Sequence, residues 1–304
     1  MNMDSILQLG IILLGCSIGF SRSALFITIG YGMAIAVCGI ELLVLIGLYQ
    51  QTHSFTYMSI MILIHGLVYL LYGSRLAGFI YYREKNTEFK KDPSHRMEIE
   101  ITFTGVIILW IGVSFLYYCY TLPPLISLRA LKENGYLSPI IHTIGLIIMG
   151  IGFTFETVSD YQKWVSKAYN PDLFCSTGLF KLCRMPNYFG ELLFWIGNYV
   201  TCFWDSKSGL QIILSSLGAL FSCWLMISAS ARLDNAQFKH YHKNPEYINY
   251  RDSVPILIPS IPIFSLRMSN KTDYNCLFYY VFPLNPFIKS NICFLNALAS
   301  FCSH

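Results

Sequence analysis

Long apolar stretches alternate with short polar segments along most of the chain. The apolar stretches cover residues 6–20, 24–49, 57–82, 99–126, 138–158, 187–204 and 209–230. An α-helix needs about 20 apolar residues to cross the hydrocarbon core of a bilayer, and the first stretch is short for a span. The pattern therefore predicts an all-α, polytopic integral membrane protein with about seven transmembrane helices.

The composition favours the same class. The chain is 54% hydrophobic and only 12% charged, whereas soluble domains carry about 25% charged residues. We expect one membrane domain over residues 1–265 and a C-terminal tail, 266–304, to which the sequence assigns no role. The lipid bilayer is the expected partner, together with a lipophilic small molecule.

Charge and cysteine usage narrow the function classes. The net charge of +4 is small and the basic residues lie in loops, so we expect no nucleic-acid partner. The ten cysteines are scattered without a C-x-x-C spacing, which predicts neither a metal site nor a disulfide framework.

The loop charges predict an orientation. With the N-terminus outside, the cytosolic segments are 21–23, 83–98, 159–186 and the part of the domain after 230. These segments carry fourteen Lys and Arg residues, and the opposite loops 50–56, 127–137 and 205–208 carry three. Cytosolic loops of membrane proteins are enriched in Lys and Arg, so we expect the N-terminus outside and the C-terminus inside.

The polar stretch 156–191 is the strongest candidate for chemistry. It ends in Arg-Met-Pro-Asn-Tyr-Phe-Gly-Glu at 184–191, directly before an apolar helix. Pro186 suits a first helical turn, and a helix N-terminus beside Arg184 would bind an anion such as a phosphate. Alternatively, Arg184 reaches lipid headgroups and Asn187 only caps the helix.

Other polar residues leave two interpretations open. Asp160 could accept hydrogen bonds from a ribose or amide, or pair with Lys163. Arg75 lies about 10 Å inside the end of the third stretch, where it could bind an anion, face a cavity or reach the interface. Segment 247–251 could close over a ligand or belong to an interfacial aromatic belt.

Glu41 and His65 are ionisable residues deep in the second and third stretches. The connecting loop is short, so both residues are expected about 12 Å below the same membrane face. Together they could form a proton-donating catalytic pair. Otherwise they are a structural polar pair, or they point in different directions.

The motif at 184–191, with Gly178-Leu179-Phe180 before it, resembles the steroid 5α-reductase C-terminal family, most closely an uncharacterised membrane branch. Further matches are Ser159-Asp160-x-Gln162-Lys163, Tyr-Gly-x-Arg-Leu at 72–76 and Tyr247-x-x-Tyr250-Arg251, so the resemblance spans roughly 70–260. It implies a seven-helix reductase of the endoplasmic reticulum membrane whose NADPH site faces the cytosol. The implied cofactor-binding residues are Arg75, Asp160, Asn170, Arg184, Asn187, Tyr188, Glu191, Tyr247 and Arg251.

The resemblance implies NADPH-dependent reduction of a carbon–carbon double bond conjugated to a carbonyl, in a sterol, polyprenol or acyl-lipid substrate. Two features depart from the family: Met185 replaces the usual histidine, and the family's Gln–Glu substrate pair has no match. The alternatives are an S-adenosylmethionine-dependent lipid or prenylcysteine methyltransferase, whose family has a similar motif, and a non-catalytic membrane scaffold.

Overall fold

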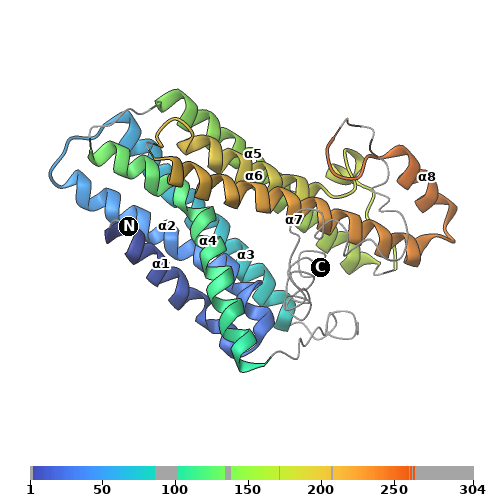
Figure 1. Cartoon of the computed structure of the whole chain (residues 1–304). Helices are drawn as coiled ribbons and strands as arrows, with labels where there is room; N and C mark the ends of the chain where they lie inside the picture. Colours follow the sequence, from blue (N-terminus) through green and yellow to red (C-terminus); the bar gives the residue numbers. More distant parts are fainter. Residues whose placement is uncertain are drawn as a thin grey trace. The chain divides into compact units, whose positions relative to one another are not determined.

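The described part of the chain is built from α-helices. The computed structural model describes residues 3–85, 102–133, 138–170, 172–206, 208–259, 261 and 263. The helices are α1 (Met3–Cys16), α2 (Ile29–Gln50), α3 (Tyr57–Lys85), α4 (Phe103–Lys132), α5 (Pro139–Tyr169), α6 (Pro186–Cys202), α7 (Gly209–Tyr241) and α8 (Pro245–Ser253) (Figure 1). Short 3₁₀ turns are η1 (Ser17–Phe20), η2 (Ser23–Phe26) and η5 (Gly178–Lys181). The all-α prediction is confirmed for these residues, and the predicted tail 266–304 lies outside them.

Each predicted apolar stretch contains one helix, but within the described ranges only five helices are long and apolar enough to cross a membrane. These five are α2, α3, α4, α5 and α7. Helices α5 and α7 continue well beyond the predicted ends at 158 and 230, to Tyr169 and Tyr241. At 1.5 Å per residue, each is longer than the ~30 Å hydrocarbon core. The expected loop 159–186 therefore begins only after α5 ends.

The described helices divide into two compact units. Unit 1 comprises Met1–Ile151 and Leu193–Ser222, and unit 2 comprises Gly152–Leu192 and Cys223–His304. Each unit is described on its own below.

In unit 1, α2 and α3 pack closely through glycines. A Cβ atom on Gly39 would lie 2.8 Å from the Gly66 carbonyl oxygen, and one on Gly73 would lie 2.4 Å from the Gly32 carbonyl oxygen. These spacings require backbone-to-backbone contact, which only a residue without a side chain allows. Small residues at such interfaces are typical of helix packing in membranes, where apolar burial alone does not favour association.

Polar contacts attach α1 to α4. Lys132 Nζ lies 3.1 Å from Asp4 Oδ2, Arg129 donates a hydrogen bond to Ser5, and Gln8 Nε2 donates to the Thr121 carbonyl oxygen over 2.9 Å. The sequence predicted Arg129 and Lys132 in an extramembrane loop. They lie instead in the last turn of α4, where basic side chains face the negative end of the helix dipole.

Two prolines, Pro123 and Pro124, lie inside α4. Proline has no backbone N–H, so Pro124 leaves the Tyr120 carbonyl oxygen without its helical partner. Two side chains replace the missing donor, Asn198 Nδ2 at 2.8 Å and the Tyr69 hydroxyl at 3.2 Å. Asn198 of α6 and Tyr69 of α3 thus satisfy a helix interruption that would be costly in a bilayer.

Candidate functional site

The candidate site of unit 2 begins with the loop between α5 and α6. Gly178 has a positive φ of 61°, and the following Leu179 N–H donates to Gln162 Oε1 over 2.9 Å. A Cβ atom on Gly178 would lie 2.4 Å from the Gln162 amide nitrogen. Both residues belong to the motifs that carry the family resemblance, and together they fix the turn that leads into η5.

The loop then pairs with the segment after α8. The backbone N–H groups of Arg184 and Met185 donate to the carbonyl oxygens of Pro255 and Ile256, each over 2.9 Å. The Tyr250 hydroxyl donates to the Phe180 carbonyl oxygen over 2.7 Å. Two segments about seventy residues apart in sequence therefore lie side by side.

Helix α6 begins at Pro186 and packs against α5 through Gly190. A Cβ atom there would lie 2.6 Å from the backbone nitrogen of Glu156, so this position of the motif has a packing role. Met185, at the position where the resemblance implies a histidine, is buried at 1% exposure. An apolar side chain suits that environment because it needs no hydrogen-bond partner.

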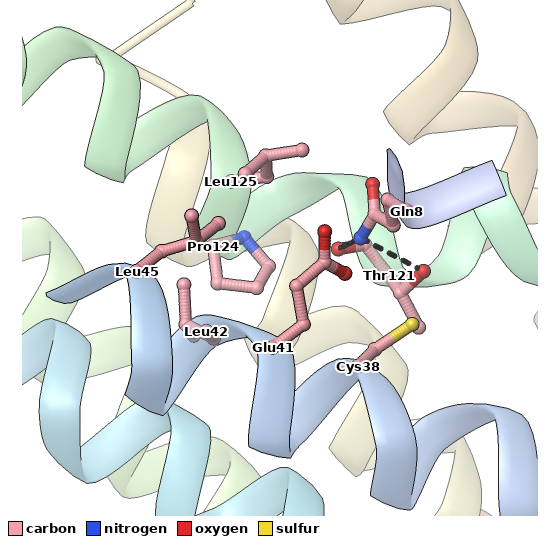
Figure 2. Close-up of a pocket in the computed structure, with 8 residues that line it drawn as sticks. All are labelled: Gln8, Cys38, Glu41, Leu42, Leu45, Thr121, Pro124 and Leu125. Carbon is pink, nitrogen blue, oxygen red and sulfur yellow. Dashed lines mark hydrogen bonds between the residues drawn. The ribbon is translucent and has the colours of Figure 1, made fainter. Parts of the chain in front are cut away.

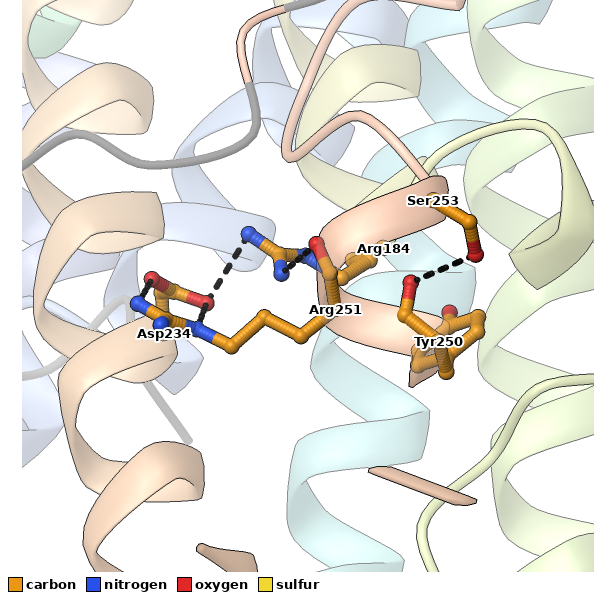
Figure 3. Close-up of polar contacts among 5 residues, drawn as sticks. All are labelled: Arg184, Asp234, Tyr250, Arg251 and Ser253. Atoms are coloured by element: carbon orange, nitrogen blue, oxygen red, sulfur yellow. Dashed lines mark hydrogen bonds and ion pairs between the residues drawn. The ribbon is translucent and has the colours of Figure 1, made fainter. Parts of the chain in front are cut away.

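Two arginines converge on one aspartate at the centre of the site (Figure 3). Arg184 Nη2 lies 3.0 Å from Asp234 Oδ1, and Arg251 Nη2 lies 2.8 Å from Asp234 Oδ2. Arg184 Nη1 also donates to the Arg251 carbonyl oxygen over 2.8 Å. The site thus links the loop before α6, the end of α7 and α8 through charge-assisted hydrogen bonds.

Burial and charge set the protonation of the surrounding groups. Hydrogen bonding to Asp234 raises the pKa of Arg251, whereas burial lowers the pKa of the more enclosed Arg184 against the attraction of the same carboxylate. Both guanidinium groups remain protonated, as arginine does in proteins. Burial, and then the Asp234 charge, raises the pKa of Tyr247 to about 12, and burial also raises the pKa of Tyr250. Both phenols therefore remain hydrogen-bond donors at neutral pH.

Tyr247 is fully buried and electrostatically coupled to Asp234, Arg184 and Arg251. Within the described ranges, its hydroxyl has no hydrogen-bond partner. A buried donor of this kind is unusual, because an unmade hydrogen bond costs about 1–3 kcal/mol. The Tyr247 hydroxyl is thus a buried donor that the described residues leave unused.

The remaining predicted cofactor residues are distributed along unit 2 and α3. Tyr188 is buried and Asn187 and Glu191 are half-buried at the start of α6, while Asp160 is half-buried on α5. Asn170 closes α5 and accepts a hydrogen bond from the Asp172 N–H over 3.1 Å. Arg75 belongs to unit 1, where its guanidinium carbon lies 5.7 Å from the centre of the Tyr72 ring.

Asp234 was not predicted as a site residue. It lies seventeen residues before Arg251 and on a different helix, so the spacing of the two residues in the sequence does not predict that their side chains meet. One signal was present in the sequence: Asp234 is a carboxylate shortly after a long apolar stretch, where a charged side chain needs a partner.

Glu41 and His65 occur in different polar clusters of unit 1. Glu41 lines a pocket with Gln8 and Thr121 (Figure 2), whereas His65 Nε2 lies 3.1 Å from Asn198 Oδ1 and its ring centre lies 5.6 Å from that of His142. Across the described residues, no hydrogen bond or ion pair joins Glu41 to His65. A direct pair is therefore absent there, and a role for either residue in proton donation stays a prediction.

The comparisons with known proteins give one match. Residues 26–254 match the model of a family described as a protein of unknown function (DUF1295), and this match covers most of the chain. Neither the curated proteins nor the solved structures include a significant match.

Proposed function

Since the chain belongs to the DUF1295 family, we propose from its own site that it is an NADPH-dependent membrane reductase. The proposed reaction is reduction of a carbon–carbon double bond conjugated to a carbonyl, in a lipophilic substrate of sterol, polyprenol or acyl-lipid type. The motifs at 178–191 and 247–251 support this proposal through their resemblance to the steroid 5α-reductase C-terminal family. The endoplasmic reticulum, with the cofactor site on the cytosolic side, is the proposed location.

The observation that carries the proposal is the convergence of Arg184, Arg251 and Tyr247 in unit 2. These residues come from two sequence segments, and they combine two cations with a buried phenol that has no hydrogen-bond partner in the described part of the chain. Such a donor set fits the anionic phosphates and polar groups of a nicotinamide dinucleotide. NADPH, when bound, would supply the hydride.

Within this proposal, Arg184 and Arg251 neutralise phosphate charge and the Tyr247 hydroxyl donates a hydrogen bond. Asp234 holds both guanidinium groups in place. Arg184 and Tyr247 are 2% and 0% exposed, so we expect the segment after α8 to shift when a cofactor enters. The same burial favours an alternative in which the cluster only stabilises the fold, and the following experiment separates the two.

Arg251→Lys is expected to weaken NADPH binding about ten-fold or more, because lysine keeps the charge but loses the bidentate fork. The measurement is energy transfer from tryptophan to NADPH in purified protein in a nonionic detergent. Lys243→Ala, at an exposed position between α7 and α8, is the matched control and should bind as the wild type does.

Three results would contradict the proposal at different points. Saturable binding of S-adenosylmethionine without binding of NADPH would favour a methyltransferase. Binding of neither cofactor by folded protein would favour a scaffold. An unchanged lipid profile in cells lacking the protein would argue against any lipid reductase, because an unsaturated precursor is expected to accumulate.

We also propose that α1 and α6 cross the bilayer, which gives seven spans with the N-terminus outside and the C-terminus inside. The acceptor sequence Asn270-Lys271-Thr272 would then lie in the cytosol and remain unglycosylated. An acceptor sequence introduced into the loop 205–208 is expected to gain a glycan. Mobility before and after endoglycosidase treatment measures both, and a glycan on Asn270 would overturn the orientation.

A further inference from the structure

The outer face of the last part of α5 is apolar. This part, residues 152–169, belongs to unit 2. Its exposed residues are Thr154, Val158, Tyr161, Trp164, Val165, Ala168 and Tyr169. Its four charged residues, which are all buried or half-buried, are Glu156, Asp160, Lys163 and Lys167. This polarity is the reverse of that of a surface helix in water, whose charged residues lie on the outer face.

The polar side chains of this part of α5 make contacts within unit 2. Lys167 Nζ donates to the Leu173 carbonyl oxygen and to the Tyr241 hydroxyl, each over 2.8 Å, and Gln162 Oε1 accepts from the Leu179 N–H. Helix α7 differs at its own end in the same unit, because it exposes the basic residues Lys239 and His240. The end of α7 is therefore suited to water, whereas the outer face of α5 is suited to an apolar environment.

The length of α5 matches a bilayer together with its headgroup regions. Its 31 residues extend over about 45 Å at 1.5 Å per residue, and a bilayer with headgroups is about 40–45 Å thick. In unit 1 the same helix exposes Ile144, Ile147 and Ile151, as a lipid-facing helix does. In unit 2 the exposed rings of Tyr161 and Trp164 lie 6.2 Å apart, and these two residue types are enriched where a membrane meets water.

We propose that the exposed face of α5 at residues 158–169 binds the interfacial region of the bilayer, with Val158 against the acyl chains and Tyr169 among the headgroups. Lipid is the partner, because tyrosine and tryptophan combine an apolar ring with a polar tip and the face belongs to a membrane-spanning helix. The contact holds unit 2, which contains the Arg184–Asp234–Arg251 cluster, at the membrane surface. A lipophilic molecule could then approach this unit without crossing water. The inference does not depend on reductase activity.

The test is tryptophan quenching in the full-length protein in phosphatidylcholine nanodiscs. The signal of Trp164 is the difference between the wild type and Trp164→Phe. Lipids brominated near the glycerol end of the acyl chain are expected to quench this signal about two-fold or more strongly than iodide in the water does, because an interfacial ring touches lipid. Trp195→Phe gives the matched reference, since Trp195 is 1% exposed and its signal should respond to neither quencher.

Two further reporters measure depth in the Trp164→Phe background. Val158→Trp and Tyr169→Trp lie eleven residues apart, or about 16 Å along the helix. Lipids brominated near the chain end should quench Val158→Trp more strongly, and iodide should quench Tyr169→Trp more strongly. Iodide quenching of all three positions without quenching by lipid would place the face in water. Quenching by neither agent would mean that protein, such as a second copy of the chain, covers it, and either result would overturn the proposal.

Discussion

Replacing Asp234 with asparagine is expected to destabilise the protein by about 3–5 kcal/mol, the usual cost of removing one partner from a buried ion pair. Asparagine has nearly the same size, so the change removes charge rather than volume. Arg184 and Arg251 would then face each other without the carboxylate that joins them, at 1% and 11% side-chain exposure. The ion pairs that connect α7 to α8 and to the loop before α6 would be lost together with the Asp234 carboxylate.

Thiol labelling during thermal unfolding measures this effect, because Cys183 is fully buried beside Arg184 and reacts only when unit 2 opens. Asp252→Asn is the matched control at an exposed position and should change stability by less than about 0.5 kcal/mol. Removing one cation should relieve the repulsion, so Asp234→Asn combined with Arg184→Gln is expected to cost less than the sum of the two single changes. An Asp234→Asn variant that unfolds at the wild-type temperature would show that the ion network contributes nothing.

The sequence predicted the helices because each long apolar stretch is a local signal. It did not predict their ends, because α5 and α7 leave the apolar region as helices and continue through residues that are polar but good helix formers. It also did not predict α8, a nine-residue helix capped by Asn244 with no apolar stripe of its own. Its position depends on backbone pairing with the loop before α6, which no local pattern encodes.

The candidate site was predicted only in part, because some of its contacts join segments that are distant in the sequence. Arg184 stood out beside the helix start at Pro186 and Arg251 within segment 247–251, and the resemblance implied a cofactor role for both. The partner that orients them, Asp234, is defined only by the fold. In unit 1, Glu41 stood out as an ionisable residue in an apolar helix. Gln8, which lines the same pocket, lies on α1, and the sequence analysis noted of that stretch only that it is short for a membrane span. Side chains that meet across helices are a tertiary property, and a single sequence contains little information on it.

Gly73→Val is expected to prevent stable packing of α2 on α3, with a cost of about 3 kcal/mol or more. A Cβ atom at this position would lie 2.4 Å from both the Ala36 nitrogen and the Gly32 carbonyl oxygen. Both atoms belong to the backbone of α2, so no side chain can turn away to make room. The helices would have to separate along a contact that also includes Gly39 and Gly66, and packing would be lost over several turns.

Gly78→Ala on the same helix is the matched control. A Cβ atom there meets no atom within 4 Å, so alanine should be tolerated, or stabilising by about 0.5–1 kcal/mol through its higher helix propensity. The yield of monodisperse protein after detergent extraction and the unfolding temperature measure both variants. If Gly73→Val and Gly78→Ala behaved alike, the close backbone contact of α2 and α3 would be excluded. The expected difference arises because helix association in a bilayer depends on close van der Waals contact, which a side chain added at the contact position removes.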